Sequence, residues 1–246
     1  MLMNHIPPVT KNLLIINTLM FMGMIVAESY QYDLNQFLGL HFILSDHFNL
    51  SQLITYMFMH GSFSHLFFNM FAVWMFGRIL EQVWGSERFL FYYMVCGIGA
   101  GLIQELVTGI SYYTLQSGLP ADVVTQIQQE GANILQRSMN YTDPILGSLN
   151  ATLNGFTVGA SGAVYAILLA FGMTFPNQPM FVFPLPMPIK AKYFVIGYAL
   201  IELFSGLANN PGDNVAHFAH LGGMIFGFII ILYWRNKNKN HGYYYN

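Results

Sequence analysis

The chain has 246 residues, of which 54% are hydrophobic and only 8% are charged. Soluble globular proteins carry about 25% charged residues, so this deficit excludes an ordinary water-soluble domain and favours a polytopic helical protein in a lipid bilayer. The net charge of −2 provides no basic tract for nucleic acid, and the single cysteine, Cys96, excludes an internal disulfide framework and a multi-cysteine metal site.

Six apolar segments follow one another along the chain. Each is about long enough to cross a bilayer as a helix of roughly 17–25 residues, and only helices satisfy their own backbone polar groups in lipid. The expected spans are Lys11–Glu28, His65–Ile79, Phe89–Thr108, Phe156–Phe175, Lys192–Ala208 and His217–Trp234. We therefore expect an all-α membrane protein in which residues 1–246 form one membrane domain of six transmembrane helices.

The first long connection covers about residues 29–64 and contains no lysine or arginine. Its apolar residues recur at the spacing of one helix face, at Leu50, Leu53, Ile54 and Met57. This pattern predicts a short helix whose apolar face suits a position in the membrane interface.

The second long connection, about residues 109–155, is more polar. Its apolar positions predict an amphipathic helix between Pro120 and Pro144. After the last span, residues 236–246 form a polar tail rich in asparagine and tyrosine, which we expect to fray.

The basic residues predict how the chain is oriented in the membrane. If both termini are cytoplasmic, every lysine and arginine except Arg137 lies on the inner side. Cytoplasmic loops of membrane proteins carry such an excess of basic residues. We therefore expect an integral membrane protein with cytoplasmic termini and with residues 29–64 and 109–155 on the outer side.

Polar side chains gather near the outer ends of three spans. Burial of such groups in lipid is unfavourable, so each is a candidate functional group. The second span begins with His65 and Asn69, the fourth with Ser161, and the sixth with His217 and His220. At about 1.5 Å per residue, His65, Ser161 and His220 lie roughly 18–21 Å from the cytoplasmic ends of their spans. They therefore share one layer of the membrane.

Small residues predict which spans pack together. Gly223 and Gly227 form a G-x-x-x-G pattern in the sixth span, and Gly162 helps to keep the fourth span thin. Such surfaces let helix backbones approach closely in lipid, which would bring His220 within reach of Ser161. Taken singly, each small or polar residue is usually a packing device or an interhelical contact, but the joint pattern favours a site.

Ser161 and His220 are a candidate nucleophile and general base, because a serine hydroxyl needs an adjacent base. Neither of their spans contains Asp or Glu, so a Ser–His dyad is the simplest assignment. Tyr165 follows Ser161 by one helical turn and could stack on the His220 ring, or be a core aromatic. Donors for an oxyanion are the free N–H groups in the first turn after Ser161 and the side chains of His65 and Asn69.

These residues fall in three blocks that resemble the motifs of rhomboid proteases. The blocks are His60-Gly-Ser-Phe-Ser-His65-Leu-Phe-Phe-Asn69, Gly159-Ala-Ser161-Gly162 and Ala219-His220-Leu-Gly-Gly223-Met-Ile-Phe-Gly227. They lie on the second, fourth and sixth spans, in the order of the family, and the spacing to the two glycines selects His220 rather than His217.

The resemblance implies a rhomboid-type bundle with Ser161 as nucleophile and His220 as base. It implies an oxyanion hole of His65, Asn69 and Ser161, supported by Tyr165, Gly159, Gly162, Gly223 and Gly227. The expected activity is cleavage of single-span membrane proteins near the outer face of a bacterial inner membrane, with neither metal nor cofactor.

Three other functions are compatible with parts of the sequence. Non-catalytic rhomboid-like proteins act in binding or trafficking, but they lose the serine or the histidine that this chain retains. A metal-dependent protease could use His60, His65, His217 and His220, yet there is no H-E-x-x-H motif and no carboxylate beside these histidines. A channel or transporter could use Glu202 of the fifth span, but snorkelling or a hydrogen bond explains a lone glutamate near the outer end more simply.

Overall fold

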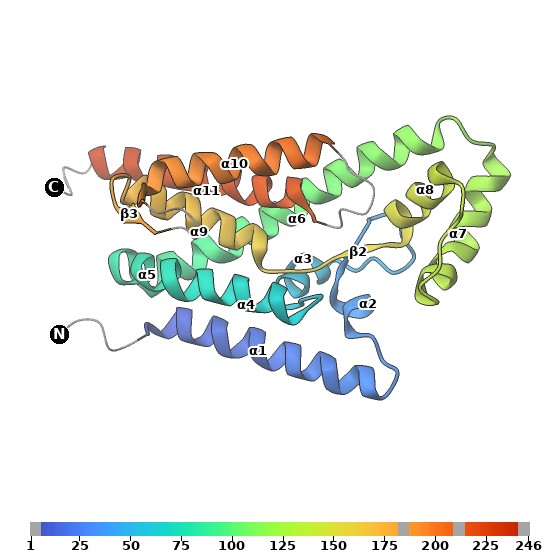
Figure 1. Ribbon diagram of the computed structural model, residues 1–246, viewed down its shortest axis with the longest axis horizontal. Helices are drawn as coiled ribbons and strands as arrows, with labels where there is room; N and C mark the ends of the chain where they lie inside the picture. The colour runs from blue at the N-terminus through green and yellow to red at the C-terminus, as the bar shows by residue number, and fades with distance from the viewer. Residues whose placement is uncertain (1–5, 182–186, 209–214, 241–246) are drawn as a thin grey trace.

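The computed structural model describes residues 6–181, 187–208 and 215–240, which form an elongated helical bundle (Figure 1). Its helices are α1 (Pro8–Ser29), α2 (Leu34–Leu38), α3 (Gln52–Thr55), α4 (Phe63–Ala72), α5 (Arg78–Trp84), α6 (Ser86–Gln116), α7 (Ala121–Gln136), α8 (Pro144–Asn154), α9 (Ser161–Thr174), α10 (Ala191–Ala208) and α11 (His217–Asn240). The shorter elements are the 3-10 turn η1 (Tyr56–Phe58), the π-helical segment η2 (Val73–Gly77), and strands β1 (Leu40–His41), β2 (Phe156–Thr157), β3 (Pro179–Met180) and β4 (Ile189–Lys190).

Within the described residues, five helical stretches are long and apolar enough to cross a membrane. They are Pro8–Ser29, Phe63–Trp84, Ser86–Gln116, Ala191–Ala208 and His217–Lys237. The all-α membrane fold expected from the sequence is thereby confirmed. The remaining apolar helix, α9, has only 14 residues and rises about 21 Å, less than the hydrocarbon thickness of about 30 Å.

The fourth expected span, Phe156–Phe175, starts too early. Its first residues form β2, which pairs antiparallel with β1 so that Leu40 faces Thr157, and the helix begins only at Ser161. A short apolar stretch such as Phe156 and Thr157 can form a strand as readily as a helix turn. Here the pairing with β1, from a distant segment of the chain, decides the outcome.

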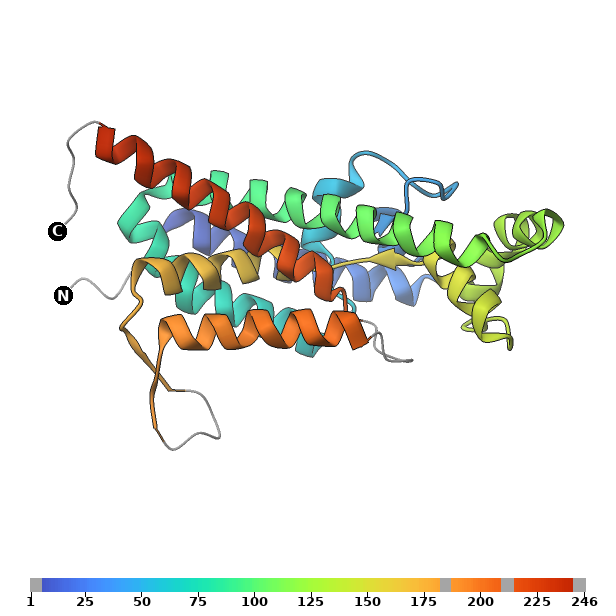
Figure 2. The same cartoon turned by 90° about the horizontal axis from the view of Figure 1, so that it is seen from above.

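Helix α9 lies at the centre of the bundle. It packs against α6 and α11 and is flanked by α10, α4 and η2, and the view from above shows α10 and α11 running beside it (Figure 2). Its inward residues Ala163, Ala166, Ile167 and Ala170 are all buried. Other helices therefore shield most of α9 from lipid, so a short helix can occupy this position.

Helices α9 and α11 touch through their backbones. A Cβ atom on Gly223 would stand 1.9 Å from the carbonyl oxygen of Gly162, and one on Gly162 would stand 2.4 Å from Cβ of Ala100. A Cβ on Gly227 would stand 2.2 Å from the Tyr92 hydroxyl. Side chains at these positions would force the helices apart, so the glycines allow α9 and α11 to pack closely on each other and on α6.

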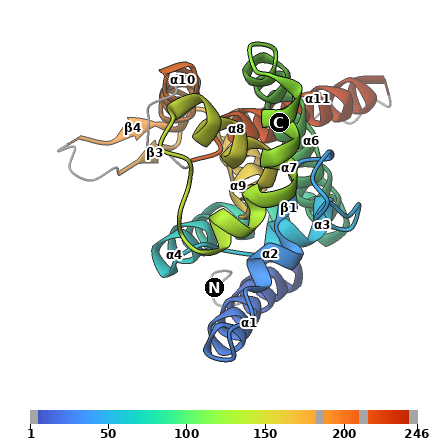
Figure 3. The same ribbon diagram turned by 90° about the vertical axis from the view of Figure 1, so that its right-hand side faces the viewer.

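The connection after α6 forms a small module at one end of the molecule. Helix α6 continues to Gln116, past the expected end at Thr108, and the amphipathic helix expected between Pro120 and Pro144 is confirmed as α7. Helices α7 and α8 pack on each other, and α8 packs on α6 (Figure 3). A second apolar core joins them to the first connection, through Phe42, Tyr112, Ile127, Leu149 and Leu153.

The first connection contains α3 and η1 where the sequence predicted a short helix. At the other end of the chain, α11 continues as a helix to Asn240, although residues 236–246 were expected to fray. Residues 241–246 lie outside the described part. Helix α1 begins and α11 ends at the same end of the bundle, opposite α7 and α8 (Figure 1).

Candidate active site

Ser161 and His220 lie within hydrogen-bonding distance of each other. Nε2 of His220 is 2.8 Å from Oγ of Ser161. Ser161 is the first residue of α9, and His220 lies in the first turn of α11 and is 7% exposed. The contact of the two helices at Gly162 and Gly223 brings these first turns together, so residues far apart in the sequence form one site.

The backbone before Ser161 is attached to the first connection. The Gly159 amide donates a 2.9 Å hydrogen bond to the Tyr56 carbonyl, immediately after the β1–β2 pair. Gly159 has a φ of +132°, and a Cβ there would stand 2.7 Å from Cε1 of His65. Both the backbone conformation and the nearby ring require glycine at this position.

Tyr165 lies one turn along α9 and its ring stacks on the imidazole of His220. The ring centroids are 4.3 Å apart and the planes are inclined by 8°. The Tyr165 hydroxyl donates to Oε1 of Glu202. Tyr165 therefore contacts His220 through its face and Glu202 through its hydroxyl.

Glu202 of α10 supplies the carboxylate that the sequence analysis missed. Its Oε2 accepts a 2.9 Å hydrogen bond from Nδ1 of His220, the ring nitrogen opposite the one that faces Ser161. The expectation of no carboxylate near the histidines was wrong, because it considered only the spans that carry Ser161 and His220. The available signal was Glu202 itself, an acid in an apolar helix that is 5% exposed in the fold.

His217 lies beside the same carboxylate. Its Nδ1 is 2.6 Å from Oε2 of Glu202, and the atoms of Glu202, His217 and His220 that could bind a metal ion lie within 4.8 Å of one another. Ligands of a tetrahedral zinc ion, with bonds of about 2.0–2.1 Å, stand about 3.3 Å apart. The separations of 2.6 and 2.9 Å are shorter and fit hydrogen bonds to the carboxylate.

The candidate oxyanion donors belong to α4, which contacts α9, and to the first turn of α9 itself. His65 borders Gly159, as its ring distance shows. The Asn69 side chain is 5% exposed and donates one Nδ2 hydrogen bond of 2.9 Å to the His65 carbonyl. The second N–H of the same amide can then donate to another acceptor. The first N–H groups of any helix have no partner within it, and Ala160 offers no side-chain cap to those of α9.

His60 lies just before α4, and its ring approaches that of His65 edge-on, with centroids 5.0 Å apart. Burial lowers the pKa of His60 to about 3, and the neighbouring His65 acts in the same direction. His60 is therefore a neutral, buried ring that packs against a candidate oxyanion residue. Neither of its ring nitrogens has a hydrogen-bond partner among the described residues, so it donates nothing to Glu202.

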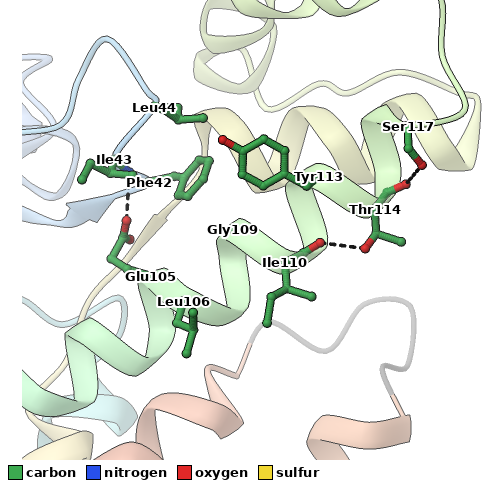
Figure 4. Close-up of a pocket in the computed structure, with 10 residues that line it drawn as sticks. All are labelled: Phe42, Ile43, Leu44, Glu105, Leu106, Gly109, Ile110, Tyr113, Thr114 and Ser117. Carbon is green, nitrogen blue, oxygen red and sulfur yellow. Dashed lines mark hydrogen bonds between the residues drawn. The ribbon is translucent and has the colours of Figure 1, made fainter.

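A pocket of about 730 Å³ lies elsewhere, between α6 and the first connection. Phe42, Tyr113 and the Glu105 carboxylate line it, and Glu105 accepts a 2.8 Å hydrogen bond from the Ile43 amide (Figure 4). None of the residues around this pocket belongs to the Ser161 cluster. The cavity therefore says nothing about the chemistry of the candidate active site.

Comparison with known proteins gives one family and several distant relatives. The family model described as "Rhomboid domain" matches residues 47–237. "Rhomboid protein 1, mitochondrial" of Saccharomyces cerevisiae is 26% identical, over 93% of this chain and 56% of that protein. "Rhomboid protease GlpG" of Yersinia pseudotuberculosis is 20% identical, over 79% of this chain and 51% of that protein.

A third relative is "Rhomboid protease AarA" of Providencia stuartii, which is 28% identical over 71% of this chain and 52% of that protein. The chain thus spans about half the length of the curated relatives that it matches. The matched region of the family model contains the candidate residues from His60 to Gly227.

Proposed function

Because this chain belongs to the rhomboid family, we propose that it is an intramembrane serine endopeptidase, with Ser161 as nucleophile and His220 as general base. The observation that carries the proposal is the 2.8 Å contact between Nε2 of His220 and Oγ of Ser161. A base at this distance can accept the serine proton as the hydroxyl attacks a peptide carbonyl.

The reaction requires donors for the oxyanion that forms on the carbonyl oxygen. Backbone N–H groups at the start of α9 and the side chains of His65 and Asn69 are the donors that we assign to this role. Asn69 can use its second N–H, since the first is engaged by the His65 carbonyl. His220 then returns the proton to the leaving amine, and water releases the acyl group from Ser161 by the same path in reverse.

The substrates that we propose are single-span membrane proteins, cut near the outer face of a bacterial inner membrane. The basic residues support cytoplasmic termini, because all but Arg137 then lie inside. The same topology puts the first turns of α9 and α11 toward the outer side, on the side of α7 and α8. The reaction as assigned needs no metal or cofactor.

The test is cleavage of a panel of anchored substrates by the purified protein, with products identified by mass spectrometry. Ser161→Ala and His220→Ala should each remove nearly all cleavage, and the double variant should be little worse, because the pair acts as a unit. A serine-directed fluorophosphonate should label Ser161, and strong chelators should leave the rate unchanged. Folded Ser161→Ala protein that cuts at the wild-type rate would refute the assignment.

A further inference from the structure

Glu202 receives hydrogen bonds from three side chains of two neighbouring helices. The Tyr165 hydroxyl donates to Oε1, while Nδ1 of His217 and Nδ1 of His220 lie 2.6 and 2.9 Å from Oε2. The residue is 5% exposed, and a carboxylate buried to this degree requires such donors to replace its lost hydration. All three donors belong to the Ser161 site or its immediate surroundings.

The bond from His220 decides which ring nitrogen can act as a base. An ionised carboxylate only accepts hydrogen bonds, so the imidazole carries its proton on Nδ1. Nε2 then has a free lone pair toward the Ser161 hydroxyl, 2.8 Å away. In the other tautomer, Nε2 would carry the proton and could not accept one from Ser161.

We propose that Glu202 is a positioning residue that extends the Ser161–His220 pair to a triad. This inference rests on the proteolytic function proposed above. As Oγ of Ser161 bonds to the carbonyl carbon, its proton moves to Nε2 of His220, and Glu202 stabilises the resulting imidazolium through Nδ1. The proton then passes to the leaving amine, and Glu202 neither gains nor loses a proton.

Glu202 also connects α10 to α9 and α11, so its loss could act through folding alone. The two roles predict different kinetics. A purely structural loss lowers the fraction of folded molecules, each of which reacts at the normal rate. The loss of a positioning group lowers the rate of every folded molecule, including its reaction with reagents that need no docked substrate.

The experiment compares Glu202→Gln with Glu105→Gln in the full chain, purified in detergent. Glu105 is a matched control, because it is also a carboxylate in an apolar helix, α6. It accepts its hydrogen bond from the Ile43 amide, outside the site (Figure 4). A fluorophosphonate reports on Ser161 directly. Its rate constant measures the reactivity of folded molecules, and the labelled fraction measures how many have folded.

We expect Glu202→Gln to lower the labelling rate constant, and kcat for an anchored fluorogenic substrate, by at least about 100-fold, with KM within about twofold of wild type. Glu105→Gln should retain the wild-type values of all three. A wild-type rate constant for Glu202→Gln would overturn the inference, whatever its labelled fraction.

Glu202→Asp provides a second test if too little Glu202→Gln folds to be labelled. It keeps the charge but withdraws the carboxylate by one methylene, so slowed labelling of folded protein supports positioning and a wild-type rate constant overturns it. Wild-type protein that neither becomes labelled nor cleaves would overturn the proposed function and this inference together. Slowed labelling in the Glu202 variants alone, with active wild-type protein, supports both the proteolytic function and the positioning role of Glu202. Active wild-type protein with unslowed Glu202 variants overturns the positioning role only.

Discussion

The phenol ring of Tyr165 lies almost parallel to the imidazole of His220, with 4.3 Å between the ring centroids. The stack limits rotation of the imidazole about its own axis, while the hydroxyl of Tyr165 contacts Glu202. One side chain thus restrains the candidate base through its face and the neighbouring carboxylate through its edge.

Replacing Tyr165 should separate these two contacts. Tyr165→Ala removes both the hydroxyl bond to Glu202 and the stack, which is worth about 0.5–1.5 kcal/mol in aromatic pairs, so we expect kcat to fall by about tenfold. Tyr165→Phe keeps the stack and loses only the hydroxyl bond, and it should lose less activity. Steady-state kinetics on one anchored substrate would measure both, and equal losses would contradict a role for the ring face.

Asn69→Ala should lower kcat by about 100-fold if its second N–H donates to the oxyanion. The nucleophile and base remain, so fluorophosphonate labelling of Ser161 should still occur. His217→Ala should be milder, since His217 contacts Glu202 and is not the base assigned to Ser161. A smaller loss in Asn69→Ala than in His217→Ala would remove Asn69 from the oxyanion hole.

Gly223→Ala should weaken the contact between α9 and α11. Its Cβ would stand 1.9 Å from the Gly162 carbonyl oxygen, and overpacking of this kind destabilises a fold by about 1–3 kcal/mol. Gly197→Ala in α10 is the matched control, because no atom lies within 4 Å of its new Cβ. We expect unfolding in a denaturing detergent to be easier for the first variant only, and activity to fall with it.

The stability of the protein should fall as the pH is lowered below about 6.5. Burial lowers the pKa of His60 from 6.5 to about 3, so between these values the unfolded chain binds a proton that the folded protein excludes. His60→Leu removes this proton-binding group, and the thermal midpoint of the variant should decline less between pH 7 and pH 4.5. An identical decline in both proteins would show that His60 does not contribute.

Glu81→Gln should damage stability but not the reaction. The Glu81 carboxylate is 2% exposed and accepts hydrogen bonds from Val9 and Thr10, which attach α1 to the bundle, and from Ser86 at the start of α6. An amide would turn one acceptor into a donor that faces other donors, at about 1–3 kcal/mol. Fluorophosphonate labelling should show a smaller fraction with an unchanged rate constant, and a slowed rate constant would contradict a purely structural role.

The sequence predicted the apolar helices well, because a lipid environment leaves long hydrophobic runs little choice of structure. It failed where the run was short. Local hydropathy predicts that Phe156 and Thr157 start a span, yet they pair with Leu40 and His41. A pairing partner over a hundred residues away leaves no mark on local hydropathy.

The site was predicted in the same uneven way. Ser161 and His220 could be paired because both stand out in apolar spans at similar depth. Glu202 stands out equally, but whether its carboxylate reaches His220 depends on the rotation and position of α10 against α9 and α11. Those quantities are set by tertiary packing, so the sequence left a hydrogen bond and snorkelling as equally simple explanations for the glutamate.

The separate core of the α7–α8 module changes how heat or detergent would act on this protein. Its residues Phe42, Tyr112, Ile127, Leu149 and Leu153 are buried apart from the main core, so the module can open as a local unit while the apolar bundle stays intact. The first step of a melting curve could then report the module alone. Loss of fluorophosphonate labelling, measured on the same samples, would mark the melting of the bundle.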